Sequence, residues 1–250
     1  MPSLLRLLPL AAALISLTGC ATYLTPGPKA DLQAFAPAAI QDAFAVQPTR
    51  PFPASIALVR VQSPEYTNYN LRRHGGQHGS GRYSVVLSRE VGEDNHVDRI
   101  ASLPQVTGLV ALNRMLLPSQ LEGDQDIRGA AARLHADLVF IYTFDTTFID
   151  ENTAKPLSVI TLGLSPTRRI TAVTTASALL LDTRTGYVYS AYETTSRKTA
   201  LATSWGSADS ADAVRRETET TAFAKLVDEF TASWPALVAG EAPRNKSRDI

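Results

Sequence analysis

The segment that most constrains the fold is residues 124–144, where an amphipathic helix runs directly into an apolar strand. Over residues 124–135 the apolar side chains recur at the i, i+3, i+4, i+7 spacing of one helix face. Residues 137–144 form the strongest β-rich, apolar run of the chain and predict a central strand. Because a strand is also predicted over residues 106–112, the three elements indicate a β-α-β unit with parallel strands and a right-handed crossover.

Before this unit, residues 55–62 and 83–87 have the β-rich composition of strands, and the first is apolar enough to be covered on both faces. A short helix follows them. It begins at Asp94 or Asn95, either of which can cap it, and it ends before Pro104.

After the unit, residues 169–181 and 187–197 predict a β-hairpin, and Gly186 suits the left-handed position of its turn. A long helix is expected from about residue 209 to 234, because large apolar side chains recur there at helical spacing. Pro235 is expected to stop this helix, since proline lacks the backbone N–H that a helix interior needs.

These elements predict a single domain over residues 55–240 of the α/β class (α+β, with a mixed sheet). Its mixed parallel and antiparallel sheet is flanked by helices, and its C-terminal helix is long. The 250 residues are 44% hydrophobic and 19% charged, which excludes a collagen-like or highly charged disordered chain. The 24 Lys and Arg balance the 24 Asp and Glu, so a nucleic-acid partner is not expected. One cysteine excludes a disulfide framework and a multi-cysteine metal site, and no cofactor or metal is expected.

The first 19 residues have the organisation of a secretory signal peptide, with Arg6 followed by an apolar run too short to span a bilayer. The run ends in Leu17-Thr-Gly-Cys20, which resembles the bacterial lipobox, a small-residue cleavage site directly before a cysteine. The resemblance implies cleavage before Cys20, a diacylglycerol thioether on its sulfur and an acyl chain on its new amino group. The alternative is an ordinary signal peptide with a chance cysteine, but the only cysteine of the chain stands at the required position.

Ala21 bears on the membrane that the anchor would reach. By the sorting rule of lipoproteins that this site resembles, an aspartate there would favour the inner membrane, so Ala21 indicates the outer membrane, facing the periplasm. Residues 20–54 are rich in proline and predict a tether between the anchor and the domain. The polar residues 241–250 predict a frayed tail.

Residues 65–82 are the segment most suited to contact a partner. They are polar and glycine-rich, lie between two predicted strands, and contain Glu65 as the one acidic residue. Tyrosine and arginine often anchor interfaces, and the local positive charge favours an acidic protein surface, an anionic lipid headgroup or a phosphorylated glycan. A mobile surface loop is the alternative. The proposed partner-binding residues are Tyr66, Tyr69, Arg72, Arg73 and Arg82.

Candidate catalytic or metal-binding groups are sparse. His74 and His78 are four residues apart, but the glycines between them disfavour a helix and no third ligand is evident. His135, just past a predicted helix, suits a helix cap better than a general base. The chain has neither a Gly-x-Ser-x-Gly elbow nor a phosphate-binding Gly-rich loop, so an enzyme is not expected.

Two segments resemble known periplasmic lipoproteins. Residues 126–140 are a helix followed by Ala-Asp and an apolar strand, and residues 181–186 form a hairpin turn. Both resemble the lipoproteins related to the curli secretion channel subunit, the penicillin-binding-protein activator and the TolB amino-terminal domain. Together with the lipobox, residues 112–118, 138–145 and 162–166 resemble the rhombotarget lipoprotein family. That family is named for its association with rhomboid-type proteases, the rhombosortases, and the resemblance implies no functional residue beyond the lipidated cysteine.

Three functional hypotheses follow. The first is a non-catalytic, outer-membrane-anchored periplasmic lipoprotein that acts as an accessory or adaptor in envelope assembly or secretion, with an envelope protein as partner. The second is a ring-forming subunit of a secretion or export assembly. The third is an envelope hydrolase that uses the histidines of residues 65–82.

Overall fold

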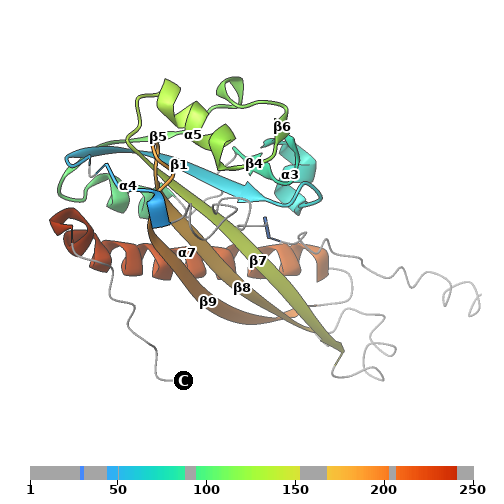
Figure 1. Cartoon of the computed structure of the whole chain (residues 1–250). Coiled ribbons are helices and arrows are strands. Elements are labelled where there is room, and N and C mark those ends of the chain that lie inside the picture. Colours follow the sequence, from blue (N-terminus) through green and yellow to red (C-terminus); the bar gives the residue numbers. More distant parts are fainter. Residues whose placement is uncertain are drawn as a thin grey trace, which may run out of the picture.

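The computed structural model describes residues 29–30, 44–49, 51–87, 94–152, 168–202 and 207–240. It confirms the predicted mixed α/β class, with a seven-stranded sheet, helices on both faces and a long C-terminal helix (Figure 1). The strands of the main sheet are β1 (Ala54–Gln62), β2 (Gln77–His78), β4 (Ser84–Val86), β5 (Val106–Ala111), β7 (Leu138–Asn152), β8 (Arg168–Asp182) and β9 (Val188–Ala202). A separate pair consists of β3 (Ser80–Gly81) and β6 (Gln120–Leu121). The helices are α3 (Tyr69–His74), α4 (Asp94–Ala101), the 3-10 turn η2 (Arg114–Leu116), α5 (Asp124–Arg133) and α7 (Ser207–Ala239).

The main sheet has the order β2-β4-β1-β7-β8-β9, with β5 as an additional neighbour of β1. Both β5 and β7 pair parallel with β1, so the strands before and after α5 are parallel to each other, as predicted, with β1 between them. On the edge of β1 that faces away from β7, β5 pairs with its first residues and β4 with its last. The prediction that residues 137–144 form a central strand is confirmed by the position of β7.

Strand β7 is buried on both faces along its first half and so divides the interior into two cores. Its even-numbered side chains over residues 138–144 pack against α7, where Phe223 and Phe230 lie. Its odd-numbered Val139 and Ile141 pack against α5. Beyond residue 144 the strand continues to Asn152, eight residues farther than predicted, with exposed side chains on one face. The apolar run of the sequence therefore ends at the point where one face of β7 becomes exposed to solvent.

The prediction that α7 stops at Pro235 is wrong, because the helix continues to Ala239. Proline removes one helical hydrogen bond. Trp234 and Leu237, on either side of it, are buried in the core, and this packing carries the helix past the proline. The helix ends at Gly240, which has a φ of 76°, the left-handed conformation that commonly terminates helices.

The end of the predicted tether is packed against the domain. Thr49 donates its backbone N–H to Oδ2 of Asp182 at 2.9 Å, and its hydroxyl donates to the same oxygen. Phe52 packs edge-on against Trp234, with ring centroids 5.4 Å apart. Thr49 and Phe52, which the sequence assigned to the tether, therefore contact the domain directly.

The predicted hairpin of β8 and β9 is confirmed, and Asp182 organises its turn, where Gly186 has a φ of 75°. Oδ1 of Asp182 accepts the backbone N–H groups of Arg184 at 2.9 Å and Thr185 at 3.1 Å. Burial by itself raises the pKa of this carboxyl, but the hydrogen bonds from Thr49 and from the turn outweigh burial and lower the pKa below its usual value.

Replacing Asp182→Asn should lower the free energy of unfolding by about 1–3 kcal/mol at pH 7, because the amide N–H₂ would face groups that are themselves donors. The folded-state pKa of Asp182 lies below the unfolded value of about 4, so its contribution is present above that value and is lost as the pH falls through the folded pKa. Urea unfolding of both proteins from pH 7 to pH 3 should show the difference shrinking below about pH 4. A difference that stays constant over this range would contradict the assignment.

Candidate functional site: the surface around helix α3

The segment predicted to contact a partner, residues 65–82, contains a short helix rather than a continuous loop. Asn68 begins it as the N-cap, because its Oδ1 accepts the backbone N–H of Leu71 at 2.7 Å. Gly75, with a φ of 69°, follows its last residue. Helix α3 has only six residues, mostly polar, so it carries too short an apolar pattern to be seen in the sequence.

Tyr66 does not lie on this surface, so the prediction that it faces a partner is wrong. Its side chain is 2% exposed and forms a small apolar cluster with Leu71 and Val86. Tyr69 is the first residue of α3, and its side chain is not among those that the structure describes.

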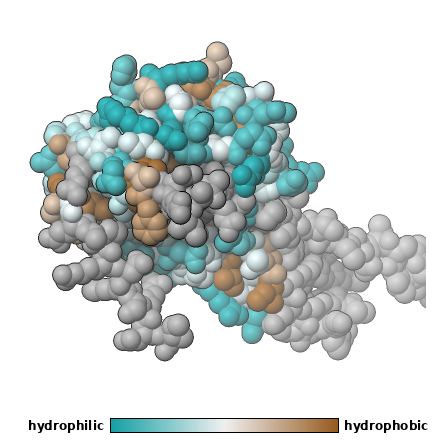
Figure 2. Space-filling view, viewed as in Figure 1, coloured by the Kyte–Doolittle hydropathy of each residue, from teal (hydrophilic) through white to brown (hydrophobic). Residues whose placement is uncertain are grey.

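Three predicted arginines are exposed. Arg72 and Arg73 lie in the last turn of α3, where positive charge interacts favourably with the helix dipole, and Arg82 follows β3. His74 is exposed beside the first two. Figure 2 shows mostly hydrophilic side chains over this upper part of the molecule, where α3 and α5 lie. The structure thus places Arg72 and Arg73 on a helix and Arg82 just after a strand, all three exposed.

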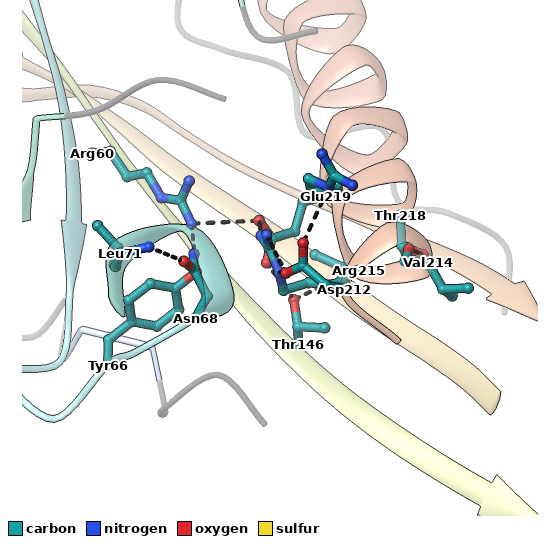
Figure 3. Close-up of polar contacts among 12 residues, drawn as sticks. Arg60, Tyr66, Asn68, Leu71, Thr146, Asp212, Val214, Arg215, Thr218 and Glu219 are labelled. Atoms are coloured by element: carbon teal, nitrogen blue, oxygen red, sulfur yellow. Dashed lines mark hydrogen bonds and ion pairs between the residues drawn. The ribbon is translucent and has the colours of Figure 1, made fainter. Parts of the chain in front are cut away.

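Beneath α3, a buried cluster of charged side chains connects the sheet to α7 (Figure 3). Oε2 of Glu219 on α7 lies 2.7 Å from Nη1 of Arg215 and 3.5 Å from Nη2 of Arg60 on β1. The side chains of these three residues are at most 4% exposed. Arg215 also pairs with Asp212 at 2.9 Å, and Asp212 in turn pairs with the exposed Arg216 at 3.3 Å.

The cluster reaches α3 through Tyr66 and Asn68. The Tyr66 hydroxyl accepts hydrogen bonds from Nη2 of Arg60 at 2.8 Å and from Nδ2 of Asn68 at 3.0 Å. Because Asn68 also caps α3, a continuous path of hydrogen bonds joins the start of this helix to α7 (Figure 3). Burial raises the pKa of Tyr66 to about 12, so the hydroxyl is protonated at physiological pH.

The second oxygen of Glu219 binds the sheet. Oε1 accepts the hydroxyl of Thr146 at 3.1 Å, and Thr146 pairs with Thr174 on the next strand at 2.9 Å. Both carboxylate oxygens are therefore occupied, and the cluster acts as a positioning element that holds α3 and α7 against the sheet. The sequence contained a signal for it, namely Arg60 as the one charged residue of a mostly apolar strand and an i, i+4 Arg-Glu pair in α7.

The histidines do not form a reactive group. His78 lies in β2, and its Nε2 is 3.2 Å from the main-chain carbonyl of Pro118, whereas His74 lies at the end of α3. His135, with a φ of 57°, takes the left-handed conformation just beyond α5. Among the described residues, no three or more His, Cys, Asp or Glu side chains are grouped to hold a metal ion.

A surface groove of about 300 Å³ lies between η2 and α5. It is lined in part by Leu116, Pro118, Gln125, Gly129 and Arg133. Its one carboxylate, Asp126, already accepts the backbone N–H of Gly123 at 3.1 Å as part of the start of α5.

Cys20 and Ala21 lie outside the described residues, as do residues 241–250. In the part of the chain that the structure covers, no helix is both long and apolar enough to cross a membrane.

Comparison with known proteins identifies no family. No protein-family model and no curated protein match the chain. A Xanthomonas campestris protein of the family described as DUF330 is similar at 11% identity over 88% of this chain and 97% of that chain, with a TM-score of 0.35. A Caulobacter crescentus protein assigned as a lipoprotein is similar at 15% identity over 42% of this chain and 70% of that chain, with a TM-score of 0.26. These TM-scores establish no shared fold or function. The structure itself defines only the class of the protein, a mixed α/β domain that exposes basic side chains at the end of α3.

Proposed function

We propose that this protein is a lipoprotein anchored in the outer membrane and facing the periplasm, where it acts as a non-catalytic accessory or adaptor in envelope assembly or secretion. The observation that carries the proposal is the position of the only cysteine, Cys20, directly after a small-residue site that closes an apolar signal. Two or more acyl chains give stable anchoring, whereas a single chain gives marginal binding. Ala21, in place of an aspartate, supports the outer membrane as the destination.

The exposed arginines support the adaptor role. Arg72 and Arg73 are held on a helix that Asn68 caps and buried Leu71 attaches to the domain, so their charges are presented on an ordered surface. A rigidly presented basic surface suits an acidic face on another envelope protein, and salt should weaken such a contact. His78, which contacts the Pro118 carbonyl, has a structural partner, which supports a non-catalytic role.

Replacing Cys20→Ser tests the anchor. The serine hydroxyl cannot form the thioether, so the variant should accumulate as an uncleaved precursor or lose its partition into detergent. Both are measured by the mass of the protein and by extraction of cell membranes with a detergent that separates into two phases. A variant that is processed and sorted like the parent protein would overturn the lipoprotein proposal.

Replacing Arg72, Arg73 and Arg82 together with serine tests the adaptor surface. Because all three side chains are exposed, the thermal midpoint should be unchanged, while crosslinked co-purification of the partner from intact cells should be lost. A variant in which Arg99, Arg114 and Arg169 are changed to serine removes the same charge elsewhere and should retain the partner. Equal recovery with both variants would mean that the basic surface of α3 binds nothing.

A further inference from the structure

The outer edge of β9 carries a long row of backbone groups that the sheet does not use. Strand β9 ends the sheet, and within the described residues no other strand pairs with its outer edge. Across the hairpin, the N–H of Asp182 donates to the carbonyl of Tyr187 at 2.8 Å, so even-numbered residues of β8 face β9. A register shift between Leu180 and Leu181 places a bulge at the start of β9, and from Leu180 back to Arg168 even-numbered residues of β8 stand opposite even-numbered residues of β9. From Ala191 onward, the odd-numbered residues of β9 therefore point their N–H and C=O groups toward the open edge.

A contact between α7 and this edge agrees with the alternation. The carbonyl of Thr195 accepts a hydrogen bond at 2.9 Å from Nζ of Lys225 on α7, rather than serving the hairpin. The side chains of Glu193, Thr195 and Arg197 are exposed on the sheet face opposite α7, since the even-numbered Thr194 hydroxyl bonds to α7. Figure 1 shows β9 as the outermost strand of the extended three-stranded part of the sheet.

We propose that β9 pairs antiparallel with β9 of a second copy of this chain, about a two-fold axis at Thr195, so that two sheets join into one. Thr195 is the middle residue of the 15-residue strand Val188–Ala202, so an axis at this residue overlaps the two strands, with regular alternation over residues 190–200 and the bulge of each copy at an end of the overlap. The axis also places outward-pointing, odd-numbered residues opposite each other, as antiparallel hydrogen bonding requires. Such two-fold, self-complementary pairing is the commonest form of homodimer.

Charge complementarity selects this register. With the axis at Thr195, Glu193 of each copy stands directly opposite Arg197 of the other, which gives two ion pairs. Moving the axis by one residue places Glu193 opposite Thr195 or Thr199 and loses both pairs. The same register brings Val188 of each copy near Leu201 of the other, and these are exposed apolar side chains at 36% and 60%.

The pairing affects two existing contacts. Lys225 must release the Thr195 carbonyl, and Glu193, whose Oε2 accepts the Ser177 hydroxyl at 3.1 Å, must also reach Arg197 of the second copy. Lysine beside a strand edge opposes indiscriminate pairing with other strands. The two Glu193–Arg197 pairs then favour this chain over an unrelated strand, since opposite charges meet only in the self-paired register. The occupant of the edge is therefore a second copy.

A cysteine crosslink in the full-length chain, in native membranes, tests the geometry. In the proposed dimer the two Thr195 Cα atoms lie about 5.5 Å apart, within the range of a disulfide. Thr195→Cys should therefore form a disulfide dimer under mild oxidation. Thr147→Cys lies exposed on the same face but two strands away, about 10 Å from β9, and should remain monomeric. Absence of the dimer at Thr195, or equal crosslinking at both positions, would overturn the proposal.

Charge exchange tests the register. In the Thr195→Cys background, Glu193→Arg or Arg197→Glu alone sets like charges opposite each other twice and should reduce crosslinking about tenfold. The double variant restores opposite charges and should restore crosslinking. Circular dichroism should show that all of them remain folded, because both side chains are exposed and the Glu193 variants lose only the hydrogen bond from the Ser177 hydroxyl. Unaffected single variants, or a double variant that crosslinks no better than the single ones, would rule out this axis whatever the outcome for the membrane anchor.

Discussion

Replacing Glu219 with alanine is expected to lower the free energy of unfolding by about 3–5 kcal/mol. The substitution leaves the guanidinium groups of Arg60 and Arg215 buried, with side-chain exposures of 2% and 1%, and removes the carboxylate between them. Water cannot reach these charges, so the cost includes an uncompensated buried charge as well as the lost hydrogen bonds. Equilibrium urea unfolding followed by circular dichroism measures the loss.

Glu217→Ala is the matched control, two residues earlier on the same helix. Glu217 pairs with Lys198, but its side chain is 56% exposed, so its loss should cost less than about 1 kcal/mol. Glu219→Gln keeps the shape of the side chain and should fall between the two alanine variants, because its oxygen can still accept from both arginines in place of Oε2, while its N–H₂ faces the Thr146 hydroxyl and the negative charge is lost. Similar losses for Glu217→Ala and Glu219→Ala would show that the buried cluster does not hold α7 in place.

The sequence predicts those parts of the fold in which a local pattern and the final burial coincide. Helix 124–133 and the first half of β7 are such elements, because one apolar face or a continuous apolar run meets the core directly. The hairpin turn is another, since Gly186 takes the left-handed conformation that its position implies. Parallel pairing then follows from the order of the elements, although the insertion of β1 between β5 and β7 does not.

The candidate site was predictable only in part, because it depends on contacts between residues that are far apart in the sequence. The composition of residues 65–82 indicates a basic surface, and Arg72, Arg73 and Arg82 are indeed exposed. Tyr66 is buried because its ring packs with Leu71 and Val86 while its hydroxyl bonds to Arg60, which itself pairs with Glu219 at the other end of the chain. No local pattern in the sequence brings residues 60, 66 and 219 together.

Replacing Trp234 with alanine is expected to lower the free energy of unfolding by about 3–5 kcal/mol. Trp234 is 1% exposed and packs against Phe52 and Phe230, with ring centroids 5.4 Å and 5.3 Å away. Its Nε1 also donates to the carbonyl of Pro104 at 2.7 Å, which ties the end of α7 to the segment after α4. The truncation opens a cavity where the N-terminal segment, the sheet and α7 meet, and thermal or urea unfolding measures its cost.

Two further variants separate packing from hydrogen bonding at this end of α7. Trp234→Phe keeps most of the apolar contact but leaves the Pro104 carbonyl without its donor, so it should cost about 1–3 kcal/mol, less than the alanine variant. Pro235→Ala restores the missing helical N–H at an exposed position and should not destabilise the protein. If Trp234 packing is what carries α7 past the proline, the cost of Trp234→Ala should shrink in the Pro235→Ala background, because the helix end then holds its own hydrogen bonds. An unchanged cost would mean that the last turn of α7 is maintained by other contacts, such as those of Leu237.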